Sequence, residues 1–276
     1  MTRALSLLLL VIALATACGG EESTAATDPA PVADPTPTPA PEPEPAPPPS
    51  RWPNEACARV IVVAYDGAVA APDGVTRSMD EARSRAAELR RRVADAHEDI
   101  ADVARAESDA ASSGPRGGLL GTYARDNFPA AHEPIRDAIF ALDVGAVSDV
   151  LEAPYGFVVA QRCEVEKIHT RHILVRYAGA RNAPDDVTRT QAEARARAEE
   201  LRTQVTAEGA DFAAIARENS EDASAEDGGD LGMVGRGLLA PAYEAAAWQL
   251  GENAVAPVVE TEFGYHVIQR LPDIEE

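Results

Sequence analysis

The chain has 276 residues, a formal net charge of -21 and only 5% aromatic residues. A typical domain takes about 100 to 200 residues, so this length predicts two domains. The acidic balance disfavours nucleic acid as a partner, because the chain and a phosphate backbone would repel each other. With so few aromatic residues, the cores are expected to consist of valine, isoleucine, leucine and alanine.

Residues 1–17 have the pattern of a secretory signal peptide, with Arg3, an apolar run and small residues before Cys18. The run is shorter than the roughly 20 residues that span a bilayer, so we expect cleavage rather than a retained transmembrane helix. The tetrapeptide that ends at Cys18 resembles a bacterial lipobox, which implies a lipid on this cysteine and anchoring in the cell envelope. Gly19 after the cysteine implies the outer membrane, facing the periplasm. Simple secretion is the alternative.

Residues 18–53 are rich in proline, alanine, glutamate and threonine and contain almost nothing to bury. Such a segment favours extended polyproline geometry of about 3.1 Å per residue, so its reach would be on the order of 100 Å. We expect a disordered linker that lets a folded body search away from the membrane.

The rest of the chain contains an internal repeat of domain size. Val75–Val93 and Val187–Val205 are identical at twelve of nineteen positions, and each copy starts with the residues of a helix capping box. Each copy reads as strand, long helix, short helix, glycine loop, helix and two strands, which is an α+β pattern. The repeat therefore predicts two tandem domains, residues 54–166 and residues 167–276.

Two histidines and an aspartate distinguish the second copy from the first. His172 and His266 lie in strand-like runs, and Asp222 precedes a glycine-rich loop. The first copy has apolar residues at the aligned positions, namely Val60, Val158 and, counted back from the aligned glycines, Ala111. Because the first copy keeps the rest of the pattern without these polar groups, we expect them to serve chemistry. The alternative is that the two histidines simply pack and pair in the core.

The second copy resembles the parvulin-type peptidyl-prolyl cis-trans isomerases over roughly residues 167–271. The resemblance lies in the order His-Ile-Leu-Val, Ser-Glu-Asp, Gly-Gly-Asp-Leu-Gly, Arg-Gly and Phe-Gly-Tyr-His. It implies, in each copy, a four-stranded antiparallel sheet wrapped by helices. It also implies a hydrogen-bonded floor of His172, Asp222 and His266 that orients the substrate. The residues implied to bind the proline ring are Leu231, Leu239 and Tyr243, with Thr261 and Phe263 near the edge of the pocket.

The resemblance implies rotation about X-Pro peptide bonds, without a cofactor or a metal ion. A metal site would be the competing use of two histidines and an aspartate, but the sequence has no closely spaced pair such as His-x-x-x-His. Uncatalysed rotation crosses a barrier of roughly 18 to 20 kcal/mol and is slow enough to limit folding.

The expected function is therefore isomerisation that assists the folding of exported proteins, with catalysis in the second domain only. The expected partners are unfolded or nascent exported polypeptides that contain X-Pro bonds. The alternative is a non-catalytic periplasmic holdase that uses both domains as peptide-binding modules.

Cys57 and Cys163 are the only cysteines besides Cys18, and oxidation is expected in an exported chain. In the fold that the resemblance implies, the first and last strands of a domain are antiparallel neighbours, in which paired positions have a constant sum. The sum for the two cysteines differs by only two from the sum for Val60 and Val158. This predicts a disulfide bond within the first domain; two buried free thiols are the alternative.

Overall fold

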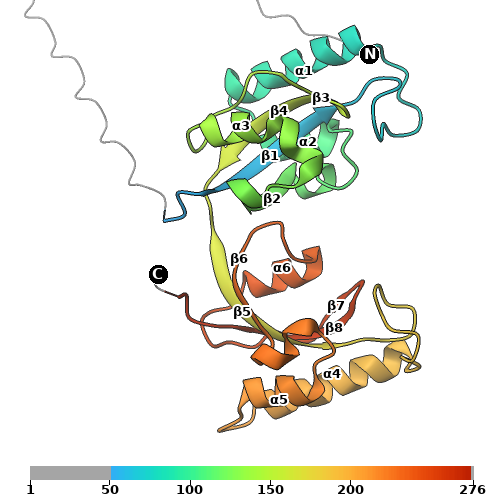
Figure 1. Ribbon diagram of the computed structural model, residues 1–276, viewed down its shortest axis with the longest axis vertical. Coiled ribbons are helices and arrows are strands. Elements are labelled where there is room, and N and C mark those ends of the chain that lie inside the picture. The colour runs from blue at the N-terminus through green and yellow to red at the C-terminus, as the bar shows by residue number, and fades with distance from the viewer. Residues whose placement is uncertain (1–50, 275–276) are drawn as a thin grey trace, which may run out of the picture. The chain divides into compact units, whose positions relative to one another are not determined.

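The computed structural model describes residues 51–274, so the expected signal peptide, the lipid on Cys18 and most of the linker lie outside the described residues. It contains two four-stranded antiparallel sheets with strand orders β2-β1-β4-β3 and β6-β5-β8-β7. We call the part built on the first sheet domain 1 and the part built on the second sheet domain 2 (Figure 1). The predicted α+β class is confirmed. Within residues 51–274, no helix combines the length and the apolar character needed to cross a bilayer.

The two domains repeat one order of elements. Domain 1 consists of β1 (Glu55–Val63), α1 (Met79–Ala94), α2 (Ile100–Glu107), β2 (Leu119–Ala124), α3 (Glu133–Ala141), β3 (Leu151–Ala153) and β4 (Gly156–Cys163). Domain 2 consists of β5 (Lys167–Val175), α4 (Gln191–Val205), α5 (Phe212–Asn219), β6 (Asp230–Gly235), α6 (Pro241–Ala247), β7 (Val259–Thr261) and β8 (Gly264–Arg270). Both long helices start at a complete capping box, in which Ser78 or Thr190 exchanges hydrogen bonds with a glutamate three residues later.

Each sheet has a separate hydrophobic core on each of its two faces. In domain 2, α4 and α5 cover one face and α6 covers the other (Figure 1). Side chains alternate between faces along a strand, so Ile173 and Val175 of β5 pack towards α4 and α5, whereas Ile168 packs towards α6. Domain 1 is divided in the same way, with α1 and α2 on one face and α3 on the other.

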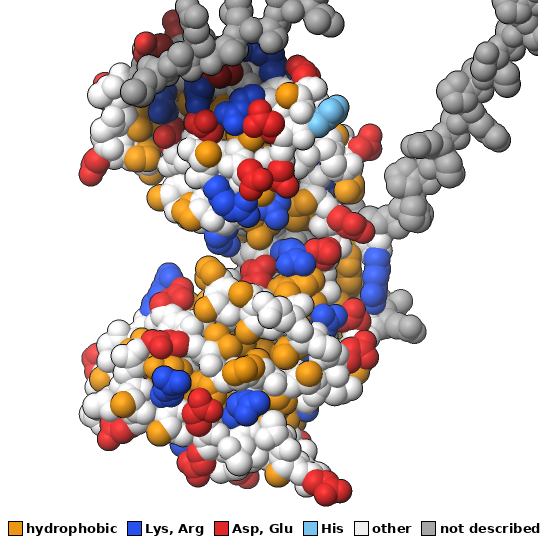
Figure 2. Space-filling view, turned by 180° about the vertical axis from the view of Figure 1, so that it is seen from behind, with side chains coloured by type: hydrophobic (Ala, Val, Ile, Leu, Met, Phe, Trp, Pro, Cys, Tyr) orange, Lys and Arg blue, Asp and Glu red, His pale blue; other side chains and the backbone are white. Residues whose placement is uncertain are grey.

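Charged side chains of both signs are interspersed on the face that Figure 2 shows. Arginines pair with nearby carboxylates, as Arg92 does with Glu98 and Glu107 at 2.8 and 3.0 Å. The net acidity of the chain therefore does not produce a surface of a single sign on this face.

The structure corrects the alignment of the two glycine loops by one residue. The hydroxyls of Ser108 and Ser220 each accept a hydrogen bond from the backbone of the central strand of their domain, so these serines are equivalent. Ala110, two residues after Ser108, therefore stands where Asp222 stands, and the prediction of Ala111 was wrong. The loop of domain 1 is one residue longer before its glycines, which counting back from those glycines could not reveal.

Each domain fixes its first strand at the same place, in domain 1 to the end of the last strand and in domain 2 to β6 and to the residues just after the last strand. In domain 1 a disulfide joins Cys57 to Cys163, with Cα atoms 4.9 Å apart, and the two residues are paired in the register of β1 and β4. In domain 2, His169 stands at the place of Cys57. Its ring nitrogens lie 3.0 Å from the carbonyl oxygen of Pro272 and 2.8 Å from a carboxylate oxygen of Asp230. One domain uses a covalent bond where the other uses hydrogen bonds.

Candidate active site

The α6 face of domain 2 holds a chain of four polar side chains, three of them buried and the fourth, Asp222, partly exposed. The rings of His172 and His266 stack with their centroids 5.2 Å apart, and their Nδ1 atoms are 2.9 Å apart. Nε2 of His266 lies 2.7 Å from Oγ1 of Thr261, and Nε2 of His172 lies 3.3 Å from Oδ1 of Asp222. The structure thus brings the three expected polar residues together and adds Thr261 as a fourth.

The backbone explains why these side chains meet. His172 and His266 lie on the adjacent strands β5 and β8, at diagonal positions of one face. The glycine loop runs directly against β5, since a Cβ atom at Gly229 would lie 2.0 Å from the carbonyl oxygen of His172. Asp222, which leads into this loop, is fixed because its Oδ1 accepts hydrogen bonds from the backbone N–H and the hydroxyl of Ser224 at 3.0 and 2.7 Å.

One arrangement of protons satisfies all four side chains. The hydroxyl of Thr261 donates to Nε2 of His266, Nδ1–H of His266 donates to Nδ1 of His172, and Nε2–H of His172 faces the carboxylate of Asp222. The last contact, at 3.3 Å, is an interaction between the N–H dipole of His172 and the charge of the carboxylate, because Nε2 of His172 makes no hydrogen bond of good geometry. The arrangement needs a neutral imidazole at His266 and an ionised carboxylate at Asp222.

The pKa shifts agree with this arrangement. The contact with His172 is the largest cause that lowers the pKa of Asp222 below its usual value, so the carboxylate is ionised. Burial lowers the pKa of His266 to about 3, because the interior disfavours a charged imidazolium. At neutral pH, His266 is therefore neutral while Asp222 carries a negative charge.

An open cavity of about 260 Å³, which we call the histidine cavity, lies against this network. Tyr243 of α6 forms one wall, and its ring meets the rings of His172 and His266 edge to face, with centroids 5.6 and 5.4 Å apart. Its hydroxyl donates to Oγ1 of Thr170 at 3.3 Å. The apolar lining consists of Leu174, Leu231, Leu238, Leu239, Ala240 and Phe263.

Four of the five residues expected to bind substrate line this cavity, and one does not. Leu231, Leu239, Tyr243 and Phe263 are part of its wall. Thr261 instead lies beneath the wall, 7% exposed, and holds His266. The lining also includes Arg176, which donates hydrogen bonds to the backbone carbonyl oxygens of Glu221 and Asn182.

Models of known protein families match both domains. One model of the PPIC-type PPIase domain matches residues 158–271, and a second model of this domain type matches residues 69–163. The chain is a two-domain parvulin. The family assignment agrees with the two antiparallel sheets and their covering helices.

Relatives of this parvulin include chaperones and isomerases. The chaperone SurA of Methylobacillus flagellatus is 35% identical over 178 residues, which are 61% of this chain and 38% of that protein. The putative peptidyl-prolyl cis-trans isomerase dodo of Drosophila melanogaster is 36% identical over 109 residues, 38% of this chain and 66% of that protein. The solved structure of PrsA from Bacillus cereus is 30% identical over 40% of this chain and 36% of that chain, with a TM-score of 0.32. The parvulin spans a little over a third of the length of the SurA proteins that it matches.

Sequence analysis missed Thr170 and the role of Thr261 in this parvulin. Both are hydroxyl residues in strands, where threonine is common for its shape alone. The repeat contained the signal, because domain 1 has an apolar residue at each corresponding place. Thr170, Thr261 and Tyr243 of domain 2 correspond to Ala58, Ala153 and Ile135 of domain 1.

Acidification is expected to destabilise domain 2 through His266. The pKa of this residue falls from 6.5 to about 3 on folding, so between these values the unfolded state binds one proton more than the folded state. The free energy of unfolding should therefore fall as the pH is lowered through this window, by up to about 1.4 kcal/mol per pH unit. Urea unfolding of domain 2 between pH 7 and pH 4 measures the slope. His266→Val is the control, and an equal slope in both proteins would contradict the assignment.

Proposed function

We propose that domain 2 catalyses cis/trans isomerisation of X-Pro bonds in exported polypeptides and that domain 1 does not. The observation that supports this is the coordinated difference between the two copies. Six polar side chains of domain 2, namely the four of the chain around the histidines together with Tyr243 and Thr170, are replaced by apolar ones in domain 1. The replacements are Ala58 for Thr170, Val60 for His172, Ala110 for Asp222, Ile135 for Tyr243, Ala153 for Thr261 and Val158 for His266.

The histidine cavity suits a proline ring and a twisted peptide bond. Conjugation in the planar bond places negative charge on the carbonyl oxygen, so the twisted bond is less polar. The apolar wall that Leu231, Leu239 and Phe263 form would displace water from the side of the bond that packs against it, which favours the twisted form over the planar ones. The reaction makes and breaks no covalent bond.

Asp222 acts in the same direction. Its ionised carboxylate lines the cavity. A substrate carbonyl oxygen bound beside it would be repelled, and the repulsion is stronger in the planar form, because that form carries more negative charge on the oxygen. His172 and His266 are positioning residues in this proposal, because they hold Asp222 and the ring of Tyr243 in place.

The two domains measured separately test this proposal. Residues 167–276 should accelerate exchange of an X-Pro peptide in proportion to protein concentration, whereas residues 54–166 should leave the uncatalysed rate unchanged. Exchange measured by NMR on one proline peptide gives both rates. Comparable activity in both halves would sink the assignment, because domain 1 lacks the network.

A non-catalytic holdase remains the second candidate, since relatives of this chain are named chaperones. In that case both halves should suppress aggregation of an unfolded protein, and neither should change the rate of proline exchange. Attachment to the cell envelope through a lipid on Cys18 rests on the sequence and stays a prediction.

A further inference from the structure

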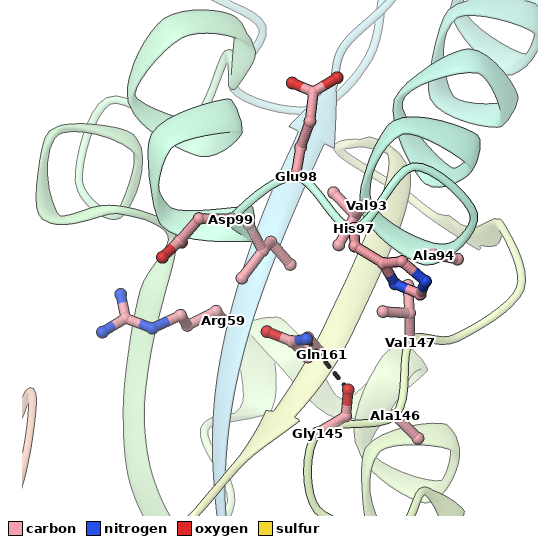
Figure 3. A pocket seen from close by; sticks show the side chains of 11 residues that line it. Arg59, Val93, Ala94, His97, Glu98, Asp99, Gly145, Ala146, Val147 and Gln161 are labelled. Atoms are coloured by element: carbon pink, nitrogen blue, oxygen red, sulfur yellow. Dashed lines mark hydrogen bonds between the residues drawn. The ribbon is translucent and has the colours of Figure 1, made fainter.

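Domain 1 contains a cavity of about 620 Å³ on the face of its sheet that α1 and α2 cover (Figure 3). Its wall includes Arg59 of β1, Gln161 of β4 and Ile100 at the start of α2, and we call it the Arg59 cavity. It lies on the opposite face of the sheet from Val60 and Val158, which replace the two histidines. The loss of the histidine network therefore does not account for it.

Domain 2 fills the corresponding space with one of its own side chains. Arg59 pairs with Gln161 across β1 and β4, and Arg171 pairs with Gln269 across β5 and β8. Nε of Arg171 donates to Oε1 of Gln269 at 2.7 Å. The guanidinium of Arg171 also lies 4.6 Å from the ring centroid of Phe212. This space in domain 2 therefore holds a guanidinium between an aromatic ring and an amide oxygen.

Domain 1 retains the amide oxygen. The side-chain nitrogen of Gln161 donates to the carbonyl oxygen of Gly145 at 3.0 Å, just as that of Gln269 donates to the carbonyl oxygen of Asn253 at 3.0 Å. Figure 3 shows the Gln161 oxygen on the side away from Gly145. The acceptor that holds Arg171 in domain 2 is thus present and oriented in domain 1.

Domain 1 lacks the guanidinium at this acceptor. Arg59 donates from Nη1 to the carbonyl oxygen of Gly117 at 2.8 Å, and its guanidinium is directed away from Gln161 (Figure 3). Ile100 stands where domain 2 has Phe212, each being the first residue of the short helix. Without the ring, no cation–π contact holds Arg59 over the cavity.

The remaining wall suits a long cationic side chain. Val93 and Val147 supply apolar surface for an aliphatic stem, and Asp99 lies at the rim. Glu98 also lines the cavity, but its carboxylate pairs with Arg92. Oδ1 of Asp99 caps α2 by accepting a hydrogen bond from a backbone N–H, and its negative charge also acts on Arg59 of the same wall. The net charge of -21 on the chain adds a general attraction for cationic segments.

We propose that the Arg59 cavity binds an arginine side chain of a client polypeptide. The incoming guanidinium takes the place that Arg171 fills in domain 2, donating to Oε1 of Gln161 and lying on the apolar wall at Ile100. A guanidinium fits better than an ammonium group, because its planar faces pack on apolar surface while its edges donate hydrogen bonds. Domain 1 thereby holds a client by a feature unrelated to proline.

Binding of short peptides without proline to the full chain tests this site independently of isomerase activity. The probes are acetyl-Ala-Arg-Ala-amide and the same peptide with lysine or alanine in the centre. Calorimetry should show one site for the arginine peptide and about tenfold weaker binding of the lysine peptide, with none for the alanine peptide. Absence of binding at millimolar peptide, or equal affinity for arginine and lysine, would overturn the proposal.

Three variants locate the site. Gln161→Leu removes the acceptor and should weaken the arginine peptide about tenfold. Gln269→Leu, which loses the same contact to the loop at Asn253 in domain 2, is its matched control and should leave the affinity unchanged. Ile100→Phe supplies the ring that domain 2 has, which lets Arg59 close the cavity, and should also weaken binding. If Gln269→Leu weakens binding as much as Gln161→Leu, or if Ile100→Phe leaves it unchanged, the Arg59 cavity is not the site.

Discussion

Replacing Cys57 and Cys163 by alanine should lower the free energy of unfolding of domain 1 by up to about 4.7 kcal/mol. The bond joins residues 106 positions apart, and a crosslink over about 100 residues stabilises by that amount in the chain-entropy model. Hydrogen exchange of β1 and β4, followed by mass spectrometry in increasing urea, measures the loss. Exchange in β5 and β8 of the same molecules is the internal control and should not change.

A thiol count completes this test. Denatured, unreduced protein should show no reactive thiol from Cys57 or Cys163, and one from each after reduction. The wild-type protein kept in reductant should match the double alanine variant, because both lack the crosslink. Two reactive thiols without reduction, or unchanged protection of β1 in the variant, would rule out the stabilising role of the bond.

Converting the network of domain 2 into its counterpart in domain 1 should abolish isomerase activity and leave the domain folded. The six substitutions are Thr170→Ala, His172→Val, Asp222→Ala, Tyr243→Ile, Thr261→Ala and His266→Val. Removing the six side chains together leaves none of them with an unpaired polar atom. The acceptors that Ser224 and the backbone N–H of Phe263 lose are also absent from domain 1, which has Ala110 and Ala153 at these places, so the loss of stability should be moderate. Rates of proline exchange and urea midpoints measure both outcomes.

The single variant His266→Val is the informative comparison. It leaves Nδ1 of His172 buried without its partner, which costs about 1 to 3 kcal/mol. We therefore expect the single variant to catalyse proline exchange more slowly than the wild type, or not at all. We also expect its urea midpoint to be lower than that of the variant with six substitutions. If the sixfold variant unfolds, the six side chains are needed for folding. If it keeps the wild-type rate of proline exchange, they are not needed for catalysis.

The fold, and the side chains that meet in the candidate site, could be predicted because the chain contains its own alignment. The capping boxes fixed where the long helices start, and the exchange of His172 for Val60 marked one place where the copies differ in chemistry. The one-residue error at Ala111 arose because the extra residue of domain 1 lies inside the glycine loop. A loop has no helix capping residue and no alternation of apolar and polar residues by which the two copies could be aligned.

The Arg59 cavity could not be predicted in the same way. Both copies have the same arginine and glutamine at the paired positions, so the sequence shows no difference there. The difference depends on Ile100 and Phe212, which are both apolar and both suit the start of a helix. Only three-dimensional packing shows that one of them holds an arginine over the sheet and the other does not.

The separate cores on the two faces of each sheet bear on how such a repeat can diverge. Substitutions on the α6 face of domain 2, or on the α3 face of domain 1, touch a different set of buried side chains from those under the long helices. After duplication, one copy can change the side chains of the first face while it keeps the hydrophobic core of the second face. Such a copy remains a stable scaffold, on which selection can act for a new ligand without having to find the fold again.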